Sequence, residues 1–576
     1  MKASDYIASV LARKQVPAVF ELVGGMITHM LDSLHVRNEV RIVSMHHEQA
    51  AAFAAEAAGR ITGIPGVAMA TSGPGATNLL TGVASCFFDS SPAVFITGQV
   101  NRNEQKGDRA IRQLGFQETD IVSMARPIVK KAWKINAAQE LPSVMEEAFV
   151  LASSGRPGPV LIDIPMDVQR DDVTPDSHGD AHVSHSPPLD ERDFIAIRDA
   201  LLHARKPMIL AGGGIRSARA TAEFRTLVRT AGVPVVHSLM GADLLPYGDP
   251  LNVGMIGSYG NRWANLALTQ SDCVIVLGSR LDVRQTGADT VGFKGDRTIF
   301  HIDCEPGEMN NRVKGCQTVL SEIKPAMIAL TETLRSISQA VIANQDSWLG
   351  EISQLRQCWP DTDELAGVEG INPNVFMHQL SRASRAAAAY VVDVGQHQMW
   401  AAQSLELNHD QRFITSGGLG SMGFGLPAAV GAAVALKGQP LVVIAGDGGF
   451  QCNIQELQTV ARLGLPAKIV VINNQCHGMV RQFQESYFDA RYQSTMWGYS
   501  APDFARISDA YGIPSRTVSE PNGVADAVSW LTADLTAPSL LQVMISPKAN
   551  AYPKLAFGKG MSSMEPHEKP LEMEGT

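Results

Sequence analysis

A glycine-rich turn with one carboxylate, followed by a pair of asparagines, is the stretch of this sequence best suited to chemistry. Gly446-Asp447-Gly448-Gly449 follows the apolar run 441–445, and Asn473-Asn474 follows a second apolar run, 469–472. The apolar runs predict buried strands, and residues from about 453 to 463 predict a helix between them. In such a strand–helix–strand unit both turns lie at the carboxyl end of a parallel sheet, so Asp447 and Asn474 can meet.

The two turns together predict a cradle for a diphosphate and a metal ion. Glycines let backbone N–H groups approach an anion, and the helix after Gly449 points its positive end at it. Asp447 and Asn474 offer the hard oxygen ligands that Mg²⁺ prefers, and we also assign Cys476 to the metal site. A lone Gly-Asp-Gly is more often a tight turn. With the paired asparagine, the arrangement resembles the fingerprint of thiamine-diphosphate enzymes.

Glu48 is the candidate catalytic carboxylate. It stands in Met45-His46-His47-Glu48-Gln49, ahead of an alanine-rich run that ends at Gly59. A carboxylate in this place is often only a first-turn charge favoured by the helix dipole. Thiamine diphosphate, however, needs one buried carboxylate that bonds its pyrimidine N1′, and burial raises the pKa of such a group so that the proton can be exchanged. The glycine-proline turn 71–78 is either a plain loop or a wall against the cofactor or substrate, and the segment 115–118 belongs to the same block.

Composition excludes several classes of protein. At 576 residues, the chain predicts three or four domains, and 45% hydrophobic with 18% charged residues fits a soluble globular protein. A net charge of −10, without a Lys/Arg-rich run, argues against a nucleic-acid partner. No apolar stretch reaches the roughly 18 residues of a membrane span, and no signal-peptide core follows Met1, so we expect a cytoplasmic protein. Seven scattered cysteines suit a reducing compartment.

The order of apolar and polar segments predicts an α/β fold with three doubly wound parallel-sheet domains. The predicted domains are 1–170, 190–340 and 370–550, followed by a C-terminal tail, 551–576. The strands expected in the first two domains are 18–22, 66–70, 93–97, 160–164, 208–211, 233–237, 273–277 and 298–302. The segments 169–192 and 336–372 are interpreted as connections. The tail from Gly558 is expected to lie over a surface or to be partly disordered.

Three further glycine-containing segments could face a ligand. Gly212-Gly213-Gly214 follows a predicted strand, which alone is weak evidence for a dinucleotide site. The segments 393–398 and 416–423 flank the diphosphate unit. A bulky side chain at Met422 could prop a bound cofactor into a bent shape, although ordinary core packing is the simpler explanation for a methionine.

Together these motifs make residues 3 to about 550 resemble the acetohydroxyacid (acetolactate) synthase branch of the thiamine-diphosphate enzymes. The resemblance implies a pyrimidine-binding domain, a central domain with a structural, non-redox FAD, and a diphosphate-binding domain. It also implies a homodimer or homotetramer in which Glu48 of one chain meets Asp447 of another.

The resemblance also assigns roles to residues at matching positions. It gives catalytic roles to Glu48, Phe116 and Gln117. The positions implied for thiamine diphosphate are Gly395, Gln396, His397, Gly420, Met422, Gly446, Asp447, Gly448, Gly449, Asn474 and Met479. Those implied for the flavin are Arg156, Gly212, Gly213, Arg280, Asp282, Arg284 and Asp303.

The chain departs from the family pattern at three positions where the acceptor substrate is expected. Met166, in Pro165-Met166-Asp167, replaces a lysine, Ile256 replaces a histidine and Phe483 replaces a tryptophan, while Arg481 remains as a possible substrate contact. The tail around 553–558 and 564–566 is similar to that of yersiniose-type branched-sugar synthases. These differences put the acceptor in question and leave the cofactor chemistry intact.

The sequence therefore predicts a carboligase that decarboxylates pyruvate and transfers the acetyl unit to a second carbonyl compound. The acceptor is a ketone, which could be a nucleotide-linked ketosugar, or a 2-ketoacid that gives acetolactate. The alternatives are an ordinary acetolactate synthase catalytic subunit, a flavin-dependent pyruvate oxidase and a simple 2-ketoacid decarboxylase. Thiamine diphosphate, Mg²⁺ and FAD are the expected cofactors.

Overall fold

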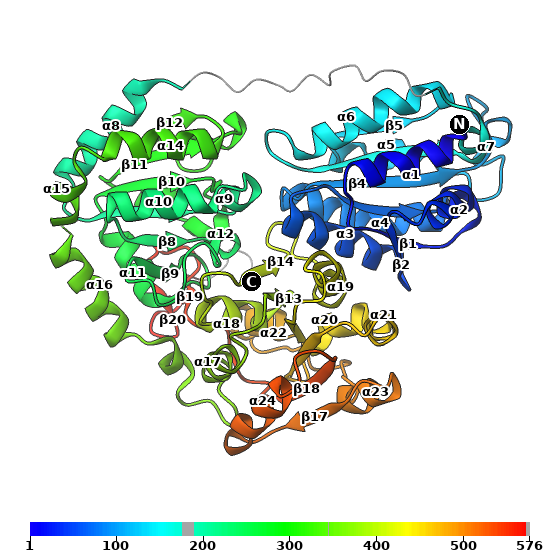
Figure 1. Cartoon of the computed structure of the whole chain (residues 1–576). Helices are drawn as coiled ribbons and strands as arrows, with labels where there is room; N and C mark the ends of the chain where they lie inside the picture. Colours follow the sequence, from blue (N-terminus) through cyan, green and yellow to red (C-terminus); the bar gives the residue numbers. More distant parts are fainter. Residues whose placement is uncertain (175–188, 344, 572–576) are drawn as a thin grey trace.

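The computed structural model describes residues 1–174, 189–343 and 345–571, and these build three six-stranded sheets in which every strand pairing is parallel (Figure 1). The predicted α/β class with three parallel-sheet domains is thereby confirmed. A short antiparallel pair, β19 (Lys554–Leu555) and β20 (Met564–Glu565), follows the third sheet. No helix in the described ranges is both long and apolar enough to cross a membrane.

The first sheet has the strand order β2-β1-β3-β4-β6-β5. Its strands are β1 (Ala18–Leu22), β2 (Arg41–Ser44), β3 (Gly66–Ala70), β4 (Ala93–Gln99), β5 (Lys131–Lys134) and β6 (Pro159–Pro165). The helices of this part are α1 (Ala3–Arg13), α2 (Thr28–Arg37), α3 (Glu48–Thr62), α4 (Pro74–Phe88), α5 (Ile121–Ala125), α6 (Leu141–Ser153) and α7 (Met166–Arg170).

The second sheet has the order β9-β8-β7-β10-β11-β12. Its strands are β7 (Pro207–Ala211), β8 (Val235–His237), β9 (Asn252–Met255), β10 (Cys273–Leu277), β11 (Thr298–Asp303) and β12 (Gln317–Leu320). The helices of this part are α8 (Glu191–His203), α9 (Gly214–Ser217), α10 (Thr221–Ala231), α11 (Arg262–Gln270), α12 (Val283–Thr286), α13 (Thr290–Lys294), α14 (Ile323–Leu334), α15 (Ser338–Ala343) and α16 (Asp346–Cys358).

The third sheet repeats the strand order of the first, as β14-β13-β15-β16-β18-β17. Its strands are β13 (Ala389–Val392), β14 (Arg412–Thr415), β15 (Leu441–Gly446), β16 (Ala467–Asn473), β17 (Ser515–Val518) and β18 (Ser539–Met544). The helices of this part are α17 (Pro373–Ala383), α18 (Gln396–Ser404), α19 (Gly425–Ala435), α20 (Asp447–Cys452), α21 (Leu457–Leu463), α22 (Gly478–Tyr487), α23 (Phe504–Ala510) and α24 (Val524–Thr532).

Three expectations about local structure were wrong or incomplete. The helix expected over 453–463 begins as a 3₁₀ turn, Ile454–Glu456, and only α21 is α-helical in this range, while a separate short helix, α20, lies before it. The supposed connection 336–372 is largely helical, because it contains α15, α16 and the 3₁₀ helix Asp361–Leu365. Of the predicted linker 169–192, residues 169–170 belong to α7 and residues 191–192 to α8, while residues 175–188 lie outside the described residues.

The C-terminal tail is more ordered than the sequence suggested. Met561 and Met564 are buried in an apolar cluster with residues of the central domain. The amide of Leu555 donates to the carbonyl oxygen of Ser258, and the guanidinium of Arg262 donates to the carbonyl of Glu565. The tail therefore ties the third domain to the second over most of its described length.

Helices α3 and α19 join the first and third domains through a shared apolar core. Small residues, mainly alanines, lie along much of α3, so the two backbones can approach closely. The rings of Phe53 and Phe424 pack edge to face with their centroids 5.4 Å apart. A Cβ added at Gly431 of α19 would lie 1.9 Å from the carbonyl oxygen of Ala54. The contact between the first and third domains therefore requires glycine at position 431.

This contact predicts opposite effects for two glycine-to-alanine changes inside helices. Gly431→Ala should destabilise the protein by more than about 2 kcal/mol, because the new methyl group overlaps the backbone of α3. Gly350→Ala in α16, where a Cβ would meet nothing within 4 Å, should be neutral or stabilising by up to about 1 kcal/mol. Thermal unfolding of the two variants measures this. Equal melting temperatures would contradict the close packing of α3 and α19.

Candidate active site

The third sheet places the predicted cradle where its strand order reverses. β13 and β15 are neighbours, and the chain leaves them in opposite directions, which is the point at which open α/β sheets bind ligands. The segment Asp393–His397 follows β13, and Gly446-Asp447-Gly448-Gly449 follows β15. Asn474 comes directly after β16, which pairs with β15. The backbone thus brings Asp447 and Asn474 to the same edge, as their spacing suggested.

Asp447 is a buried carboxylate without a cationic partner among its described contacts. Its side chain is 3% exposed, and burial raises the pKa of this carboxyl to about 6. The hydroxyl of Tyr499 donates to Asp447 Oδ2 at 3.0 Å, which fixes the orientation of the carboxylate. A cation bound at this point would restore the ionised form that burial disfavours. Within the described ranges, no three His, Cys, Asp or Glu side chains cluster as metal ligands.

Asn474 and Cys476 line the opposite side of the cradle. Asn474 Nδ2 donates to Gln396 Oε1 at 3.2 Å, and its Oδ1 accepts from the amide of Cys476 at 3.2 Å. Burial raises the pKa of the Cys476 thiol to about 11, so it stays protonated near neutral pH. A protonated thiol is a poor ligand for Mg²⁺, and Cys476 can serve the metal only through its backbone carbonyl.

His397 brings a buried, unpaired nitrogen to the cradle. Its ring lies against two glycines, since a Cβ at Gly395 or Gly446 would come within 2.7 or 2.8 Å of the ring. Burial lowers the pKa of His397 to about 3, so the imidazole is neutral. Its Nε2 finds no hydrogen-bond partner in the described part of the chain. A polar ligand would satisfy it, so the residues present fit a diphosphate and its metal ion.

The remaining thiamine-diphosphate candidates surround this cradle. A Cβ at Gly448 would lie 3.2 Å from Met422 Cε, so Met422 reaches over the glycine turn with a side chain that is partly exposed. Gly420 adopts a left-handed φ of 73° in the loop before it. Gly449 belongs to the first turn of α20, and Met479 is half-buried near the start of α22.

Glu48 opens α3 beneath the loop that follows β3. The carboxylate is 7% exposed and accepts a hydrogen bond from Asn78 Nδ2 at 2.9 Å. A Cβ at Gly75 would lie 3.2 Å from Glu48 Oε1, so this glycine leaves the carboxylate room. Gln117 has a left-handed φ of 66°, and its side chain packs on Gly73 of the same loop. The loop 71–78 therefore lies against Glu48, and Gln117 packs on that loop.

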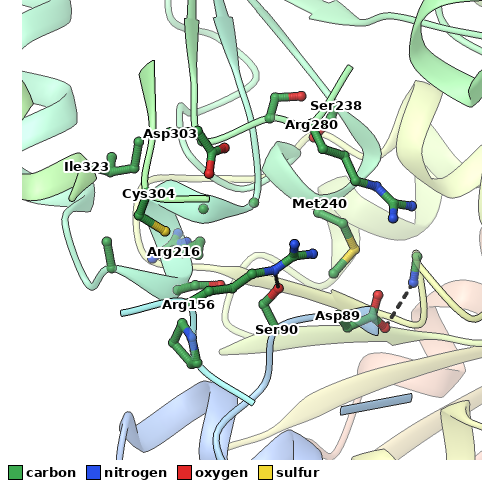
Figure 2. A pocket seen from close by; sticks show the side chains of 18 of the residues that line it. Asp89, Ser90, Arg156, Arg216, Ser238, Met240, Arg280, Asp303, Cys304 and Ile323 are labelled. Atoms are coloured by element: carbon green, nitrogen blue, oxygen red, sulfur yellow. Dashed lines mark hydrogen bonds between the residues drawn. The ribbon is translucent and has the colours of Figure 1, made fainter. Parts of the chain in front are cut away.

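The flavin candidates line one large cavity of about 1190 Å³ (Figure 2). The strand order of the second sheet, 3-2-1-4-5-6 in chain terms, is the order of dinucleotide-binding domains. Gly212 and Gly213 follow β7 and the segment 278–284 follows β10, so both lie where this order reverses. The cavity is lined by Arg156, Gly213, Arg280, Asp282, Arg284 and Asp303, and Gly212 packs against Gly278 at its edge.

The four substrate candidates are spread over the molecule. Ile256 is buried in the wall of the large cavity. Arg481 is 1% exposed, with its guanidinium donating to Glu485 Oε2 at 3.1 Å and to Asn550, so its charge is used inside the protein. Met166 begins α7, and Phe483 lies part-exposed on α22, well apart from α7 (Figure 1).

Phe116, which the resemblance assigned a catalytic role, has a side chain that is 81% exposed in this chain.

Three side chains that make defined hydrogen bonds near the site were not predicted from the sequence. Asp393 accepts from the amides of Gly423 and Gly425 and so holds the loop before α19. Asp393 lies in the segment 393–398, which was predicted to flank the diphosphate unit, but the sequence indicated no role for this side chain. Asp89 and Tyr499 carry no local pattern, because each acts on residues more than 50 positions away in the chain.

Comparison with known proteins agrees with this architecture. Three family models match: the thiamine pyrophosphate enzyme N-terminal TPP binding domain over residues 1–124, the central domain over 195–330 and the C-terminal TPP binding domain over 393–543.

Curated relatives match over nearly their whole length. The acetolactate synthase large subunit of Parasynechococcus marenigrum is 38% identical, covering 97% of this chain and 90% of that protein. The acetolactate synthase isozyme 2 large subunit of Escherichia coli is 37% identical, covering 98% and 99%. Acetolactate synthase 2 of Nicotiana tabacum is 36% identical, covering 97% and 84%. With three matched domains and a cradle of the expected composition, the chain belongs to the acetolactate synthase-like family of thiamine pyrophosphate enzymes.

Proposed function

We propose that this protein is a carboligase that decarboxylates pyruvate and transfers the acetyl unit to a second carbonyl compound. The observation that carries the proposal is the buried carboxylate of Glu48, held by Asn78 beneath a glycine loop in a chain that also has the Asp447–Asn474 cradle. The relatives named acetolactate synthase support pyruvate as the donor. A paralogue without catalytic activity would not need to keep both features.

Glu48 holds a proton at the pyrimidine N1′ of thiamine diphosphate in this proposal. When bound, the cofactor would supply a nucleophilic carbon and an acceptor for the electron pair released by decarboxylation of pyruvate. Asn78 fixes the carboxylate, and Gly75 leaves it accessible. Because the side chain is nearly excluded from water, the proton passes between Glu48 and the ligand rather than to solvent.

Asp447, Asn474 and the backbone carbonyl of Cys476 are the proposed protein ligands of Mg²⁺, which would offset the negative charge of the cofactor's diphosphate. The buried Asp447 carboxylate and the unpaired Nε2 of His397 support this assignment. Binding energy gathered at the diphosphate end holds the reactive end of the cofactor in place. Met422 would support the cofactor from the side of the 416–423 loop.

We propose FAD as the occupant of the large cavity. The dinucleotide-type strand order, the cavity volume and the guanidinium groups of Arg156 and Arg280 support an elongated anionic ligand. Arg280 pairs with Asp282 at 3.0 Å, and Arg156 with Glu308 at 2.9 Å, so both side chains are fixed before a ligand arrives. The family resemblance implies that this FAD has a structural role rather than a redox role.

The acceptor we propose is a neutral ketone larger than a 2-ketoacid. Met166 and Phe483 give less charge and more space than the lysine and tryptophan of the family pattern, and the charge of Arg481 is already paired with Glu485. Because α7 and α22 lie apart in one chain, a pocket with both Met166 and Phe483 needs a second copy, which supports a homodimer. The alternative is an ordinary acetolactate synthase, which the names of the relatives favour.

The first prediction concerns Glu48. Glu48→Gln should reduce the exchange rate of the cofactor's C2 proton by at least about 100-fold, because the amide can hydrogen-bond N1′ but cannot exchange its proton. NMR of bound cofactor after mixing with deuterated water measures the rate. Glu21→Gln, which changes another buried carboxylate of the same domain, is the control and should exchange like the wild type. A wild-type rate in Glu48→Gln would exclude the assigned role.

The second prediction concerns the flavin. The purified protein should be yellow, and its flavin absorbance should stay oxidised while pyruvate is consumed without oxygen. Anaerobic bleaching by pyruvate would instead identify a pyruvate oxidase. A colourless preparation with full activity would remove FAD from the proposal.

The third prediction concerns the acceptor. With pyruvate and equal concentrations of ketones and 2-ketoacids, mass analysis should find tertiary alcohols from the ketones as the main products, with acetolactate slower. Met166→Lys combined with Phe483→Trp should shift the kcat/KM ratio toward the 2-ketoacid by about tenfold. Ile195→Lys, which adds the same charge on the exposed side of α8, should leave the ratio unchanged. A preference for 2-ketoacids in the wild type identifies an ordinary acetolactate synthase, and free aldehyde alone a simple decarboxylase.

A further inference from the structure

The loop that carries Met422 is held at both ends by carboxylates. At its far end, Asp393 of the same domain accepts from the amides of Gly423 at 3.0 Å and Gly425 at 3.2 Å. At its near end, Asp89 accepts from the amides of Gly417 at 3.2 Å and Gly418. Asp89 belongs to the first domain, just after α4, and Figure 2 shows its hydrogen bond to this loop. One anchor of the loop thus lies across a domain boundary.

The anchor of Asp89 is part of a larger contact between α3 and the end of β14. Arg60 Nη1 donates to the carbonyl oxygen of Thr415 at 2.7 Å. Thr415 lies two residues before Gly417, the first of the two glycines whose amides donate to Asp89. Arg60 also lies 3.7 Å from the buried carboxylate of Glu56. Burial raises the pKa of Asp89, while Arg60 and the two glycine amides oppose that rise. Two side chains of the first domain, Arg60 and Asp89, therefore hold the same end of the loop by hydrogen bonds.

Hydrogen bonds inside the loop connect its anchored end to Met422. Ser416 Oγ accepts from the amides of Gly420 and Ser421, each at 3.2 Å, so the chain from 416 to 421 forms one closed turn. A displacement at Gly417 would be passed through this turn to the next residue, Met422. Asp89, Gly417 and Gly418 also line the large cavity, so the anchored end of the loop forms part of its wall.

We propose that Asp89 is a positioning residue, which sets the place of Met422 against bound thiamine diphosphate from a different domain. Removing one carboxylate oxygen would free the near end of the loop and let Met422 move away from the cofactor. This inference rests on the proposed role of Met422 in supporting the cofactor. It adds that Asp89, a residue in the wall of the large cavity, controls how Met422 supports the cofactor.

The experiment compares two Asp→Asn variants of the flavin-loaded protein. Asp272 is a matched control, because it also accepts from two consecutive backbone amides, those of Arg205 and Lys206, but in the central domain. Asp89→Asn should raise the Kd of thiamine diphosphate with Mg²⁺, measured by calorimetry, by about tenfold or more. Asp272→Asn should change it by less than about twofold. Equal Kd values for the two variants would overturn the inference.

A double-mutant cycle with Met422→Ala separates positioning from general destabilisation. If Asp89 acts through Met422, Asp89→Asn should weaken binding by less than about threefold once Met422 is alanine. An undiminished effect in that background would show that Asp89 acts by another route and would overturn the proposal. Should Asp89→Asn fail to fold, Ser416→Ala tests the same connection, since it removes the acceptor that closes the turn, and an unchanged Kd would count against the proposal.

Failure of this inference can be told apart from failure of the proposed function. A wild-type protein that does not bind thiamine diphosphate with Mg²⁺ would overturn the proposed function together with this inference. A wild-type protein that binds it, with Asp89→Asn no different from Asp272→Asn, would overturn only the positioning role of Asp89.

Discussion

The close packing of α3 on α19 is the constraint on which the rest of the structure depends. It requires small residues on α3 and a glycine at 431, where a methyl group would overlap the backbone of Ala54. These two helices follow directly on functional segments, since Glu48 opens α3 and the Met422 loop leads into α19. The same contact that forms a shared core therefore also holds Glu48 and the loop before α19 in one rigid part of the chain.

The three sheets put their ligand regions at equivalent places by two different topologies. The first and third sheets share one strand order, and the second has the dinucleotide-binding order. In each, the candidate residues follow strands at the point of reversal: the loop over Glu48 after β3, the flavin candidates after β7 and β10, and the diphosphate cradle after β15. The large cavity and the Met422 loop then share the segment of Gly417 and Gly418, which links the central domain to the third.

Much of this could be predicted from sequence, because the signals were local. Apolar runs gave β1, β3 and β10 with the observed bounds, and the Gly-Asp-Gly and Asn-Asn turns marked the cradle. The break between α20 and α21, the helices within 336–372 and the docking of Met564 in the tail depend on tertiary packing. Asp89 and Tyr499 were missed for the same reason, since their partners are distant in the chain. Arg481 was expected to face substrate, yet only the structure reveals that Glu485 and Asn550 occupy its guanidinium.

Asp447 and Asn474 are proposed to bind thiamine diphosphate through a divalent cation. A crystal structure of the protein with thiamine diphosphate and Mn²⁺, whose anomalous scattering locates the metal, tests this most directly. We predict one strong anomalous peak within about 2.0–2.3 Å of an Asp447 oxygen, Asn474 Oδ1 and diphosphate oxygens. A metal bound elsewhere, or a diphosphate placed away from the 446–449 turn, would contradict it.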